Sequence, residues 1–395
     1  MGGQRLHSPS PIRPKHIKTI HPTNLLLRIM NTRMKKTLIC GGVTSYTLDT
    51  ELPQYHIPQV GDVAVFEVLS LGKHLTVQAD SRLIVKIMPG DQIMAAFGHR
   101  YATEQFEGYV PEQCQPEFHI LGAGGTVGWV HSTHAKFSGG GPTRLKIIGY
   151  ATNERGEIIN TRKMNKSRMV PFTGAAASQT RVVLSVGSSM DSGKTTSAAY
   201  LVHGLARKGR RVTFIKLTGT VFTKDCDLAY DLGAHQALDF SDFGFPSTFM
   251  CTESELLDLY ESLLNRALES EPDYVVMEIA DGIYQRETKM LLNNARFMST
   301  VQEVMFSACD SLAAVHGVQT LRNWGIAPFA LCGMFTTSPL LMKEVREYVD
   351  VPVFTLDQLT REGVQRLLSR PQLPVDSEVP VYAMKNHSVT LADVA

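Results

Sequence analysis

The sequence predicts an α/β protein: a parallel sheet with helices on both faces, preceded by a smaller, mostly-β domain of barrel or sandwich type. Three observations predict it. After residue 181, near-continuous apolar strands alternate with amphipathic helices. Residues 37–174 instead contain short β-branched runs between Gly, Pro, Asp and Asn turns. In the stretch 181–204, a buried strand, a glycine-serine loop and a helix start follow one another.

The composition excludes several classes of protein. The chain has 395 residues, which favours two or three domains, and its net charge of +1 gives no reason to expect a nucleic-acid partner. It has no apolar run of about 18 residues, so we expect no membrane span. The six cysteines are far apart and form no C-x-x-C pair, which is typical of reduced thiols in a cytoplasmic protein.

Changes in composition divide the chain into four predicted segments. They are a basic extension over 1–36, the mostly-β domain over 37–174, a linker over 175–180 and the α/β domain over 181–395. The extension contains no Asp or Glu and can be interpreted as a targeting segment, a disordered basic arm, or a start placed too far upstream. We favour the third, because Met34-Lys35-Lys36 before a strand-like run resembles a natural beginning.

The predicted β domain consists of short strands, with turns at Gly61-Asp62, Pro89-Gly90-Asp91 and Asn153 to Gly156. This spacing is typical of a small β-barrel or sandwich. The expected strands lie within 62–72, 75–80, 82–88, 92–98, 117–125, 126–134, 144–152 and 157–162.

Three features of the predicted β domain are candidate sites. The glycines of Gly122 to Gly128 resemble a dinucleotide fingerprint, but a strand rather than a helix follows them, so we expect a tight turn or bulge. His131 and His134 would lie on opposite faces of a strand, which favours a structural or surface role. The loop 98–111 holds Arg100 and Tyr101; it is interpreted as a substrate-binding loop or as a solvated loop.

The α/β domain is expected to alternate regularly after the glycine-serine loop. Ligands in such sheets bind at the carboxyl ends of the strands, so residues at those ends are the candidates for a site. Strands are expected over 211–216, 273–279, 303–308, 327–335 and 351–356, and helices over 195–209, 253–270, 311–325, 340–349 and 360–368, with helical segments before residue 301.

The loop after the first strand has the residues of a phosphate-binding loop. Gly187 and Gly193 let the backbone wrap closely, so that N–H groups and a helix N-terminus face one anion. Lys194 can reach the β- and γ-phosphates, and the Thr195 hydroxyl can bind Mg²⁺. Five residues separate the two glycines where the usual pattern has four, so a strict match begins at Ser188. The predicted nucleotide-binding residues are Gly187, Ser188, Ser189, Met190, Asp191, Ser192, Gly193, Lys194, Thr195 and Thr196.

Two further strand ends carry polar groups. Lys216, Thr218 and Gly219 follow the second strand and are predicted to bind the substrate. Glu278 ends the third strand, where a carboxylate can bind Mg²⁺ directly or through water; a salt bridge to Lys216 is the alternative. The acidic stretch between these strands offers further metal ligands, of which one or two are expected to reach the metal and the rest to be solvated: Asp225, Asp227, Asp231, Asp239 and Asp242. Asp227 is the first choice.

These three segments, in this order, resemble the dethiobiotin synthetase-like phosphate-loop proteins. Gly187 to Thr196 matches the ATP loop, the segment KLTGT from Lys216 matches the substrate loop, and MEIADG, which contains Glu278, matches the Glu-x-x-x-Gly metal segment. A closer likeness is to the related domain family that includes D-glutamate N-acetyltransferase, many of whose members have no assigned activity. The resemblance covers roughly residues 180–360, and its motifs are specific for the superfamily but weak for any one reaction.

The resemblance implies ATP and Mg²⁺ on Lys194, Thr195 and Glu278, a substrate near Lys216 and Thr218, and a homodimer. Dethiobiotin synthetases have an aspartate where this chain has Ser189, and its own loop aspartate is Asp191. They also lack the N-terminal β domain, so their substrate does not transfer. Adenine is favoured over guanine because residues 333–339 lack the Asn-Lys-x-Asp segment of guanine sites.

Three functions follow as hypotheses. The first is a Mg-ATP-dependent ligase or kinase that activates a small carboxylate or amine-containing metabolite, with Lys194, Lys216 and Glu278 as catalytic residues. The second is an N-acyltransferase of the D-glutamate N-acetyltransferase type, in which the loop holds the diphosphate of an acyl-coenzyme A. The third is a nucleotide switch or metal-delivery protein, which the absence of a Cys/His cluster disfavours.

Overall fold

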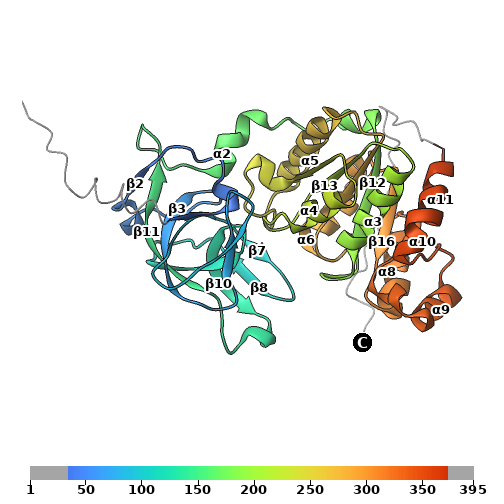
Figure 1. Ribbon diagram of the computed structural model, residues 1–395, viewed down its shortest axis with the longest axis horizontal. Helices are drawn as coiled ribbons and strands as arrows, with labels where there is room; N and C mark the ends of the chain where they lie inside the picture. Colours follow the sequence, from blue (N-terminus) through green and yellow to red (C-terminus); the bar gives the residue numbers. More distant parts are fainter. Residues whose placement is uncertain (1–33, 372–395) are drawn as a thin grey trace, which may run out of the picture. The chain divides into compact units, whose positions relative to one another are not determined.

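The computed structural model describes residues 34–371 (Figure 1). The predicted extension therefore lies outside the described residues except at its end. There, Lys35 and Lys36 form a short strand that pairs in parallel with Ile93 and Met94, so these two residues belong to the β region.

The strands of the β region close into a barrel, as the spacing of the turns predicts. The pairing runs from β6 to β3, β11, β9 and β10, and parallel pairing of β10 with β6 completes the ring. The strands are β1 (Lys35–Lys36), β2 (Thr47–Asp49), β3 (Val63–Ser70), β4 (Thr76–Gln78), β5 (Ile84–Lys86), β6 (Gln92–Phe97), β7 (Arg100–Tyr101), β8 (Phe106–Tyr109), β9 (Glu117–Gly122), β10 (Thr126–Thr133) and β11 (Arg144–Thr152).

The barrel core follows from the alternation of apolar residues along the strands. In β11, for example, Leu145 and Ile147 are buried, whereas Arg144 and Lys146 are exposed. Aromatic rings fill the centre in edge-to-face contacts, which suit the charge distribution of the rings. Phe97 lies 5.0 Å from Phe118 and 5.6 Å from Phe66, measured between ring centroids.

The β region differs from the sequence prediction in two places. Residues 157–162 do not form a strand: Ile158 makes an isolated bridge, and Asn160 caps helix α2 (Thr161–Asn165) by accepting hydrogen bonds from the backbone N–H groups of Arg162 and Lys163. The loop 98–111 is not irregular but contains β7 and β8. The Gly122–Gly128 segment is the expected turn, with Gly125 at φ +104° between β9 and β10 and a register shift after Thr126.

The second sheet is fully parallel and has the strand order β14-β13-β15-β12-β16-β17. The predicted α/β fold is confirmed by this order, in which β12, the strand before the phosphate-binding loop, is central. The strands are β12 (Arg181–Gly187), β13 (Val212–Lys216), β14 (Gln236–Asp239), β15 (Tyr274–Glu278), β16 (Glu303–Ser307) and β17 (Ala330–Cys332).

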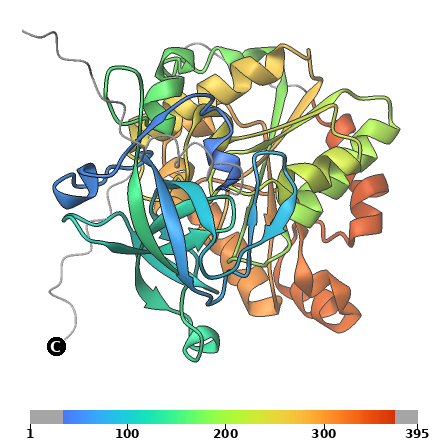
Figure 2. The ribbon, with the colours of Figure 1, turned by 60° about the vertical axis from the view of Figure 1, so that its left-hand side comes forward.

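Helices cover both faces of this sheet (Figure 2). On one face, Leu201 and Leu205 of α3 pack into one apolar cluster with Phe214 and Met305 of the sheet. On the other face, Gly317 of α8 lies against the ring of Phe306. The helices are α3 (Lys194–Arg207), α4 (Lys224–Asp231), α5 (Glu253–Leu268), α6 (Arg286–Leu292), α7 (Ala295–Met298), α8 (Ser311–Asn323), α9 (Pro339–Tyr348), α10 (Leu356–Gln358) and α11 (Val364–Ser369).

Two predictions for this sheet are corrected. Strand β14 and helix α4 occupy a stretch that the sequence left without elements, and β14 forms one edge of the sheet. The apolar run 351–356 was expected to be a strand, but within the described residues it makes only an isolated bridge between Val353 and Leu331.

The two sheets contact each other within one unit of the chain that begins at Lys35. Thr126 of the barrel donates a hydrogen bond to the carbonyl of Pro246 over 2.9 Å, and Gln78 donates one to the Thr223 hydroxyl over 2.6 Å. The segment predicted as a linker is held as well: the N–H of Ala176 donates to the buried carboxylate of Glu261 over 3.3 Å, and the Thr180 hydroxyl donates to the carbonyl of Pro272 over 2.8 Å. The domain boundaries themselves remain a prediction.

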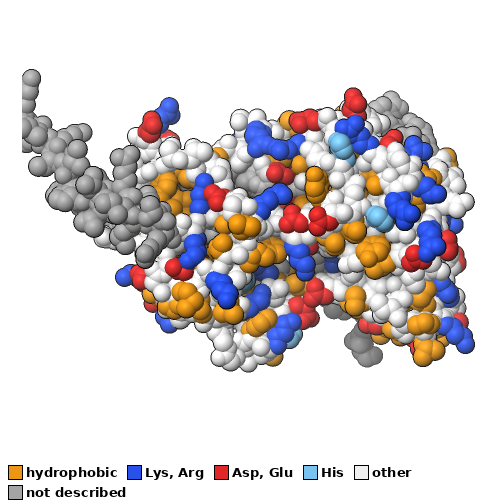
Figure 3. Space-filling view, in the orientation of Figure 1, with side chains coloured by type: hydrophobic (Ala, Val, Ile, Leu, Met, Phe, Trp, Pro, Cys, Tyr) orange, Lys and Arg blue, Asp and Glu red, His pale blue; other side chains and the backbone are white. Residues whose placement is uncertain are grey.

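Acidic and basic side chains are intermixed over the face of the molecule that Figure 3 shows, in keeping with the net charge of +1. Among residues 34–371, no helix is both long and apolar enough to cross a bilayer.

Candidate functional site

The parallel sheet brings three strand ends to one edge. In the register of the sheet, Glu278 of β15 pairs with Ser185 of β12 on one side and with Lys216 of β13 on the other. The loop after β12 leads directly into helix α3, which begins at Lys194. The predicted loop, lysine and carboxylate therefore lie at the same carboxyl edge, where ligands of such sheets bind.

Glycines shape the phosphate-binding loop. A Cβ on Gly187 would lie 2.3 Å from the Ser192 hydroxyl oxygen, so this position accepts no side chain. Gly193 has φ +94°, a left-handed backbone conformation that residues other than glycine rarely adopt. Asp191 also has a positive φ of 59° and is exposed at the tip of the loop.

Neighbouring strand ends hold the loop in place. The N–H of Ser188 donates to the carbonyl of Ser307 over 2.9 Å, and the N–H of Met334 donates to the carbonyl of Ser192 over 3.1 Å. Gly333 makes the second contact possible: a Cβ there would lie 2.5 Å from the Ser192 carbonyl oxygen. These contacts fix the loop backbone in a curve before any ligand binds.

Lys194 is folded into its own loop. Its side chain is buried, and its Nζ donates to the carbonyl of Ser189 over 2.6 Å. Burial lowers the pKa of Lys194, although the nearby charge of Glu278 acts in the opposite direction. A buried ammonium with a single carbonyl partner at good distance is well suited to exchange that partner for an anion.

A chain of charged groups runs along the strand ends. The Thr195 hydroxyl donates to Oε1 of Glu278 over 2.9 Å, and Nζ of Lys216 donates to the same oxygen over 2.6 Å. Lys216 also forms an ion pair with Asp225 over 2.8 Å. Burial would lower the pKa of Lys216, but the charges of Asp225 and Glu278 outweigh burial and raise it. Lys216 is therefore charged at neutral pH.

The second carboxylate oxygen of Glu278, Oε2, makes no hydrogen bond with any residue of 34–371. Water does not reach it either, because the residue is only 1% exposed. Burial raises the pKa of Glu278, against the lowering effect of Lys216. An unpaired oxygen of this kind costs free energy unless a cation or donor satisfies it.

The residues present fit Mg²⁺ and a nucleotide. A carboxylate and a hydroxyl are oxygen ligands of the type that Mg²⁺ takes, together with phosphate oxygens and water. Such a site does not need a cluster of protein ligands; in the described part of the chain no three His, Cys, Asp or Glu side chains gather in that way. Thr195 and Glu278 would hold the metal, and the loop backbone with Lys194 would hold the phosphates.

The aspartate beside this site is Asp225 rather than Asp227. Asp227 accepts a hydrogen bond from the Thr223 hydroxyl and lies 3.5 Å from a guanidinium nitrogen of Arg82. Asp225 instead contacts Lys216, and the charge of Lys216 lowers its pKa against the effect of burial. The contacts of Asp227 therefore do not support its predicted role as a metal ligand.

The predicted substrate residues converge in part. Tyr101, Thr218 and Gly219 line one small pocket next to the phosphate-binding loop, and Asp281 and Glu287 line it too. Its volume is about 10 Å³, which is room for roughly one water molecule. A metabolite would therefore have to open this pocket.

Arg100 is tied to the barrel. Its guanidinium donates to the carbonyl of Leu121 over 2.6 Å and to the side chain of Gln105 over 2.7 Å, while its Nε is buried without a partner. Burial lowers the pKa of Arg100 to about 10, and the charge of Asp281 counteracts this. Arg100 thus lies near Asp281 but has little freedom to bind a substrate in this conformation.

The sequence indicates Asp225 only as one of the aspartates of the acidic stretch, and it does not indicate Gly333 or Cys309 as parts of this edge. The Cys309 sulfur lies 3.2 Å from the Ser189 hydroxyl. Gly333 lies within the predicted strand 327–335, and no motif marks it as part of a site. The remaining predicted loop residues, Ser188, Ser189, Met190 and Thr196, are partly exposed, and Ser192 is buried.

Comparisons with known proteins give no family. A scan against protein-family models finds no match, and no curated protein matches either. Solved structures with partial likeness include a DUF1611 family protein from Anabaena variabilis (14% identity, TM-score 0.35, 51% of this chain and 60% of that one). Others are the signal recognition particle receptor FtsY from Elizabethkingia anophelis (16%, 0.28, 52% and 60%) and the hydrogenase maturation factor HypB from Archaeoglobus fulgidus (12%, 0.33, 53% and 97%).

The chain thus covers 60% of the length of the first two of these structures. Likenesses with TM-scores this low add nothing to the description of the fold. The assignment of a phosphate-loop α/β fold rests on the strand order and on the loop geometry of this chain itself.

Proposed function

We propose that this protein is a Mg-ATP-dependent enzyme that activates a small metabolite by phosphoryl transfer. The observation that carries the proposal is the juxtaposition of Lys194, Thr195 and the unpaired Oε2 of Glu278 at the carboxyl ends of neighbouring strands. A buried carboxylate that lacks a partner beside a glycine-rich loop is an arrangement that a metal-nucleotide complex would complete.

Each residue has a role that follows from its position. The loop backbone from Gly187 to Gly193 binds phosphate oxygens, and Lys194 leaves the Ser189 carbonyl to neutralise charge on them. Thr195 and Glu278 hold the metal. Mg-ATP itself supplies the transferable phosphoryl group.

Lys216 connects this edge to the substrate. It is charged and is held between Asp225 and Glu278, one strand away from the loop. Lys216 bonds to Oε1 of Glu278, so a metal on Oε2 would leave this bond in place but would draw off part of the carboxylate charge. More of the charge of Lys216 would then be available to an anionic group of the substrate or to the phosphoryl group. Thr218 and Tyr101 in the adjacent pocket are the groups next to that position.

Calorimetric titration of the full-length protein tests the proposal. ATP with Mg²⁺, GTP with Mg²⁺ and acetyl-coenzyme A are titrated in parallel. We expect ATP to bind, with little hydrolysis until a metabolite mixture is added. Binding of acetyl-coenzyme A with indifference to ATP would overturn the proposal and favour an acyltransferase; binding of GTP with steady hydrolysis would favour a nucleotide switch.

The metal role of Glu278 is tested by Glu278→Gln. This substitution keeps the shape but removes the charge, so we expect the Mg²⁺ concentration for half-maximal ATP binding to rise about tenfold. Glu303→Gln is the matched control, because Glu303 is also a buried strand glutamate but pairs with Arg370 instead of facing the loop. Equal Mg²⁺ dependence in both variants would contradict the assignment.

A further inference from the structure

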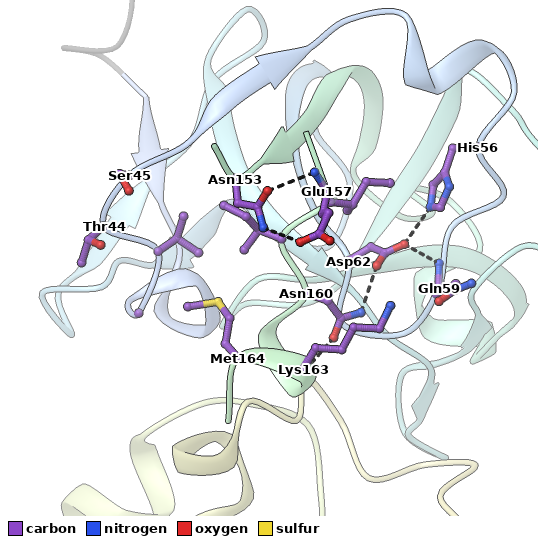
Figure 4. Close-up of a pocket in the computed structure, with 14 residues that line it drawn as sticks. Thr44, Ser45, His56, Gln59, Asp62, Asn153, Glu157, Asn160, Lys163 and Met164 are labelled. Atoms are coloured by element: carbon purple, nitrogen blue, oxygen red, sulfur yellow. Dashed lines mark hydrogen bonds and ion pairs between the residues drawn. The ribbon is translucent and has the colours of Figure 1, made fainter. Parts of the chain in front are cut away.

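A second pocket lies in the β region, apart from the phosphate-binding loop. It has a volume of about 750 Å³, within the range of small-molecule sites. Figure 4 shows the segments that form it: the loop 42–45, the stretch from His56 to Asp62, the turn 153–160, and the first turn of α2 with Lys163 and Met164. No part of the function proposed above uses these residues.

The floor of this barrel pocket is rigid. Asp62 is 2% exposed, and its carboxylate accepts hydrogen bonds from Nε2 of His56 (2.8 Å), the N–H of Gln59 (2.9 Å) and Nδ2 of Asn160 (2.9 Å). The His56 ring also packs edge-on against Tyr150, with centroids 4.8 Å apart. The position of the ring is therefore fixed from two sides, and its Nδ1 has no partner among residues 34–371.

The walls of the barrel pocket carry one free charge of each sign. Nζ of Lys163 makes no hydrogen bond or ion pair with another described residue, although its backbone N–H is held by Asn160. Across the pocket, Glu157 is oriented by Asn153, which donates to its Oε2 over 2.9 Å. Oε1 of Glu157 is left without a partner in the described part of the chain.

Apolar side chains contribute to the lining as well. Val43, Ile158 and Met164 line the barrel pocket together with Lys163 and Glu157. No Phe, Tyr or Trp is among the residues that line it, so the imidazole of His56 is the one ring of the lining on which a flat ligand could stack. A ligand with charge of one sign would meet a like charge on one of the two walls.

We infer that the barrel pocket binds an amino-acid-like zwitterion. The carboxylate of the ligand pairs with Lys163, its ammonium group pairs with Glu157, and its apolar chain lies on Val43, Ile158 and Met164. His56, held by Asp62, donates or accepts a further hydrogen bond and gives the ligand a fixed orientation. The pocket is a second small-molecule site on the same chain.

The inference is tested with small ligands that carry either both charges or one of them. The full-length protein is titrated with 4-aminobutyrate, 6-aminohexanoate and L-leucine, and with hexanoate and hexylamine as singly charged probes; binding is followed by saturation-transfer NMR. We expect at least one zwitterion to bind with a dissociation constant below about 10 mM. The dissociation constant of each singly charged probe should be about tenfold higher. Failure of all three zwitterions, or equal binding of a singly charged probe, would overturn the inference.

Variants locate the bound ligand. Lys163→Gln and Glu157→Gln should each weaken zwitterion binding about tenfold. Lys166→Gln, three residues further along the same segment, is the matched control and should leave it unchanged. Lys194→Ala should also leave it unchanged; loss of binding in that variant alone would assign the ligand to the phosphate-binding loop and overturn the inference.

Discussion

The phosphate-loop edge of the parallel sheet and the barrel pocket are both polar, but they treat their charges in opposite ways. At the edge, Lys194 and Glu278 are buried, Lys216 is half-buried, and all three bond to protein groups. In the barrel pocket, Lys163 and Glu157 are exposed and have no partner of opposite charge in the described part of the chain. Burial accounts for the difference, because a buried charge must be paired whereas a solvated one need not be. A ligand at the edge therefore has to exchange partners, and a ligand in the barrel pocket does not.

The largest effect is expected from Lys194→Ala. Removing the ammonium leaves the phosphates without their direct cation, so affinity for Mg-ATP should fall about a thousandfold. The free energy of unfolding should change by less than about 1 kcal/mol, because Nζ has weak or local partners. Calorimetric titration and urea unfolding measure the two quantities.

Lys208→Ala at the far end of α3 is the control for this variant. It removes an exposed charge from the same helix without touching the loop. If Lys194→Ala bound ATP and acetyl-coenzyme A as the wild type does, the loop could not be the nucleotide site.

A side chain at Gly333, whose backbone contacts the phosphate-binding loop, should destabilise the protein. Gly333 has φ +110°, and a Cβ there would meet the Ser192 carbonyl and Ala308 at about 2.5 Å, so Gly333→Ala should lower the free energy of unfolding by about 3 kcal/mol. Gly325 also has a positive φ of 80° but open space around it. Gly325→Ala should therefore cost only about 1 kcal/mol. Equal losses in urea unfolding would mean that the close approach contributes nothing.

Substitutions at the floor of the barrel pocket should destabilise the protein more than substitutions at its charged walls. Asp62→Ala leaves three donors without their acceptor, which should cost about 2 kcal/mol. Lys163→Gln should stay within about 0.5 kcal/mol, because its side chain has no partner to lose. Thermal unfolding of the two variants measures this. A large loss in Lys163→Gln would show that the lysine is structural and would remove the contrast with the phosphate-loop edge.

Lys73 is an intermediate case, half-buried beside other cations. Burial and the charge of Arg100 lower its pKa from 10.5 to about 7. The unfolded chain keeps this proton up to about pH 10, whereas the folded chain releases it near pH 7. The unfolded state therefore binds more protons in this window, and stability should rise with pH between 7 and 10.

After allowance for solvent screening, the gain should be about 1 kcal/mol. Lys73→Met removes the titrating group, so its melting temperature should be less dependent on pH over the same window. If the melting temperatures of the two proteins changed equally with pH over this window, Lys73 would not be the titrating group.

The sequence was sufficient for the fold because its strong patterns are local. The strand, loop and helix around Lys194 are contiguous, and the alternation of exposed and buried residues in β11 is visible from Arg144 to Ile147. Strand β14 was missed because it is short, lies at an edge and has polar residues at both ends, Gln236 and Asp239. Residues 157–162 have an apolar start, but Asn160 caps a helix, and the capping hydrogen bonds outweigh the strand propensity.

Site residues could be predicted only where the end of a strand determines their position. Lys216 and Glu278 end neighbouring strands, so the parallel topology alone brings them together. Asp225 and Asp227 are two positions apart on a helix and point in different directions, and choosing between them requires the helix to be known. The barrel pocket draws on four separate segments, so no stretch of sequence carries its signal.

The ring closure of the barrel has a consequence for synthesis of the chain. Val63 donates a hydrogen bond to the carbonyl of Ile159, and β6 pairs with β10, from which the three strands β7, β8 and β9 separate it. Contacts between segments so far apart form only after the intervening chain exists. Strand β3 can pair with β6 early, but its other edge pairs with β11 and must wait until residue 152 has left the ribosome. During that interval the apolar residues of β3 lack part of their packing and can be bound by a chaperone.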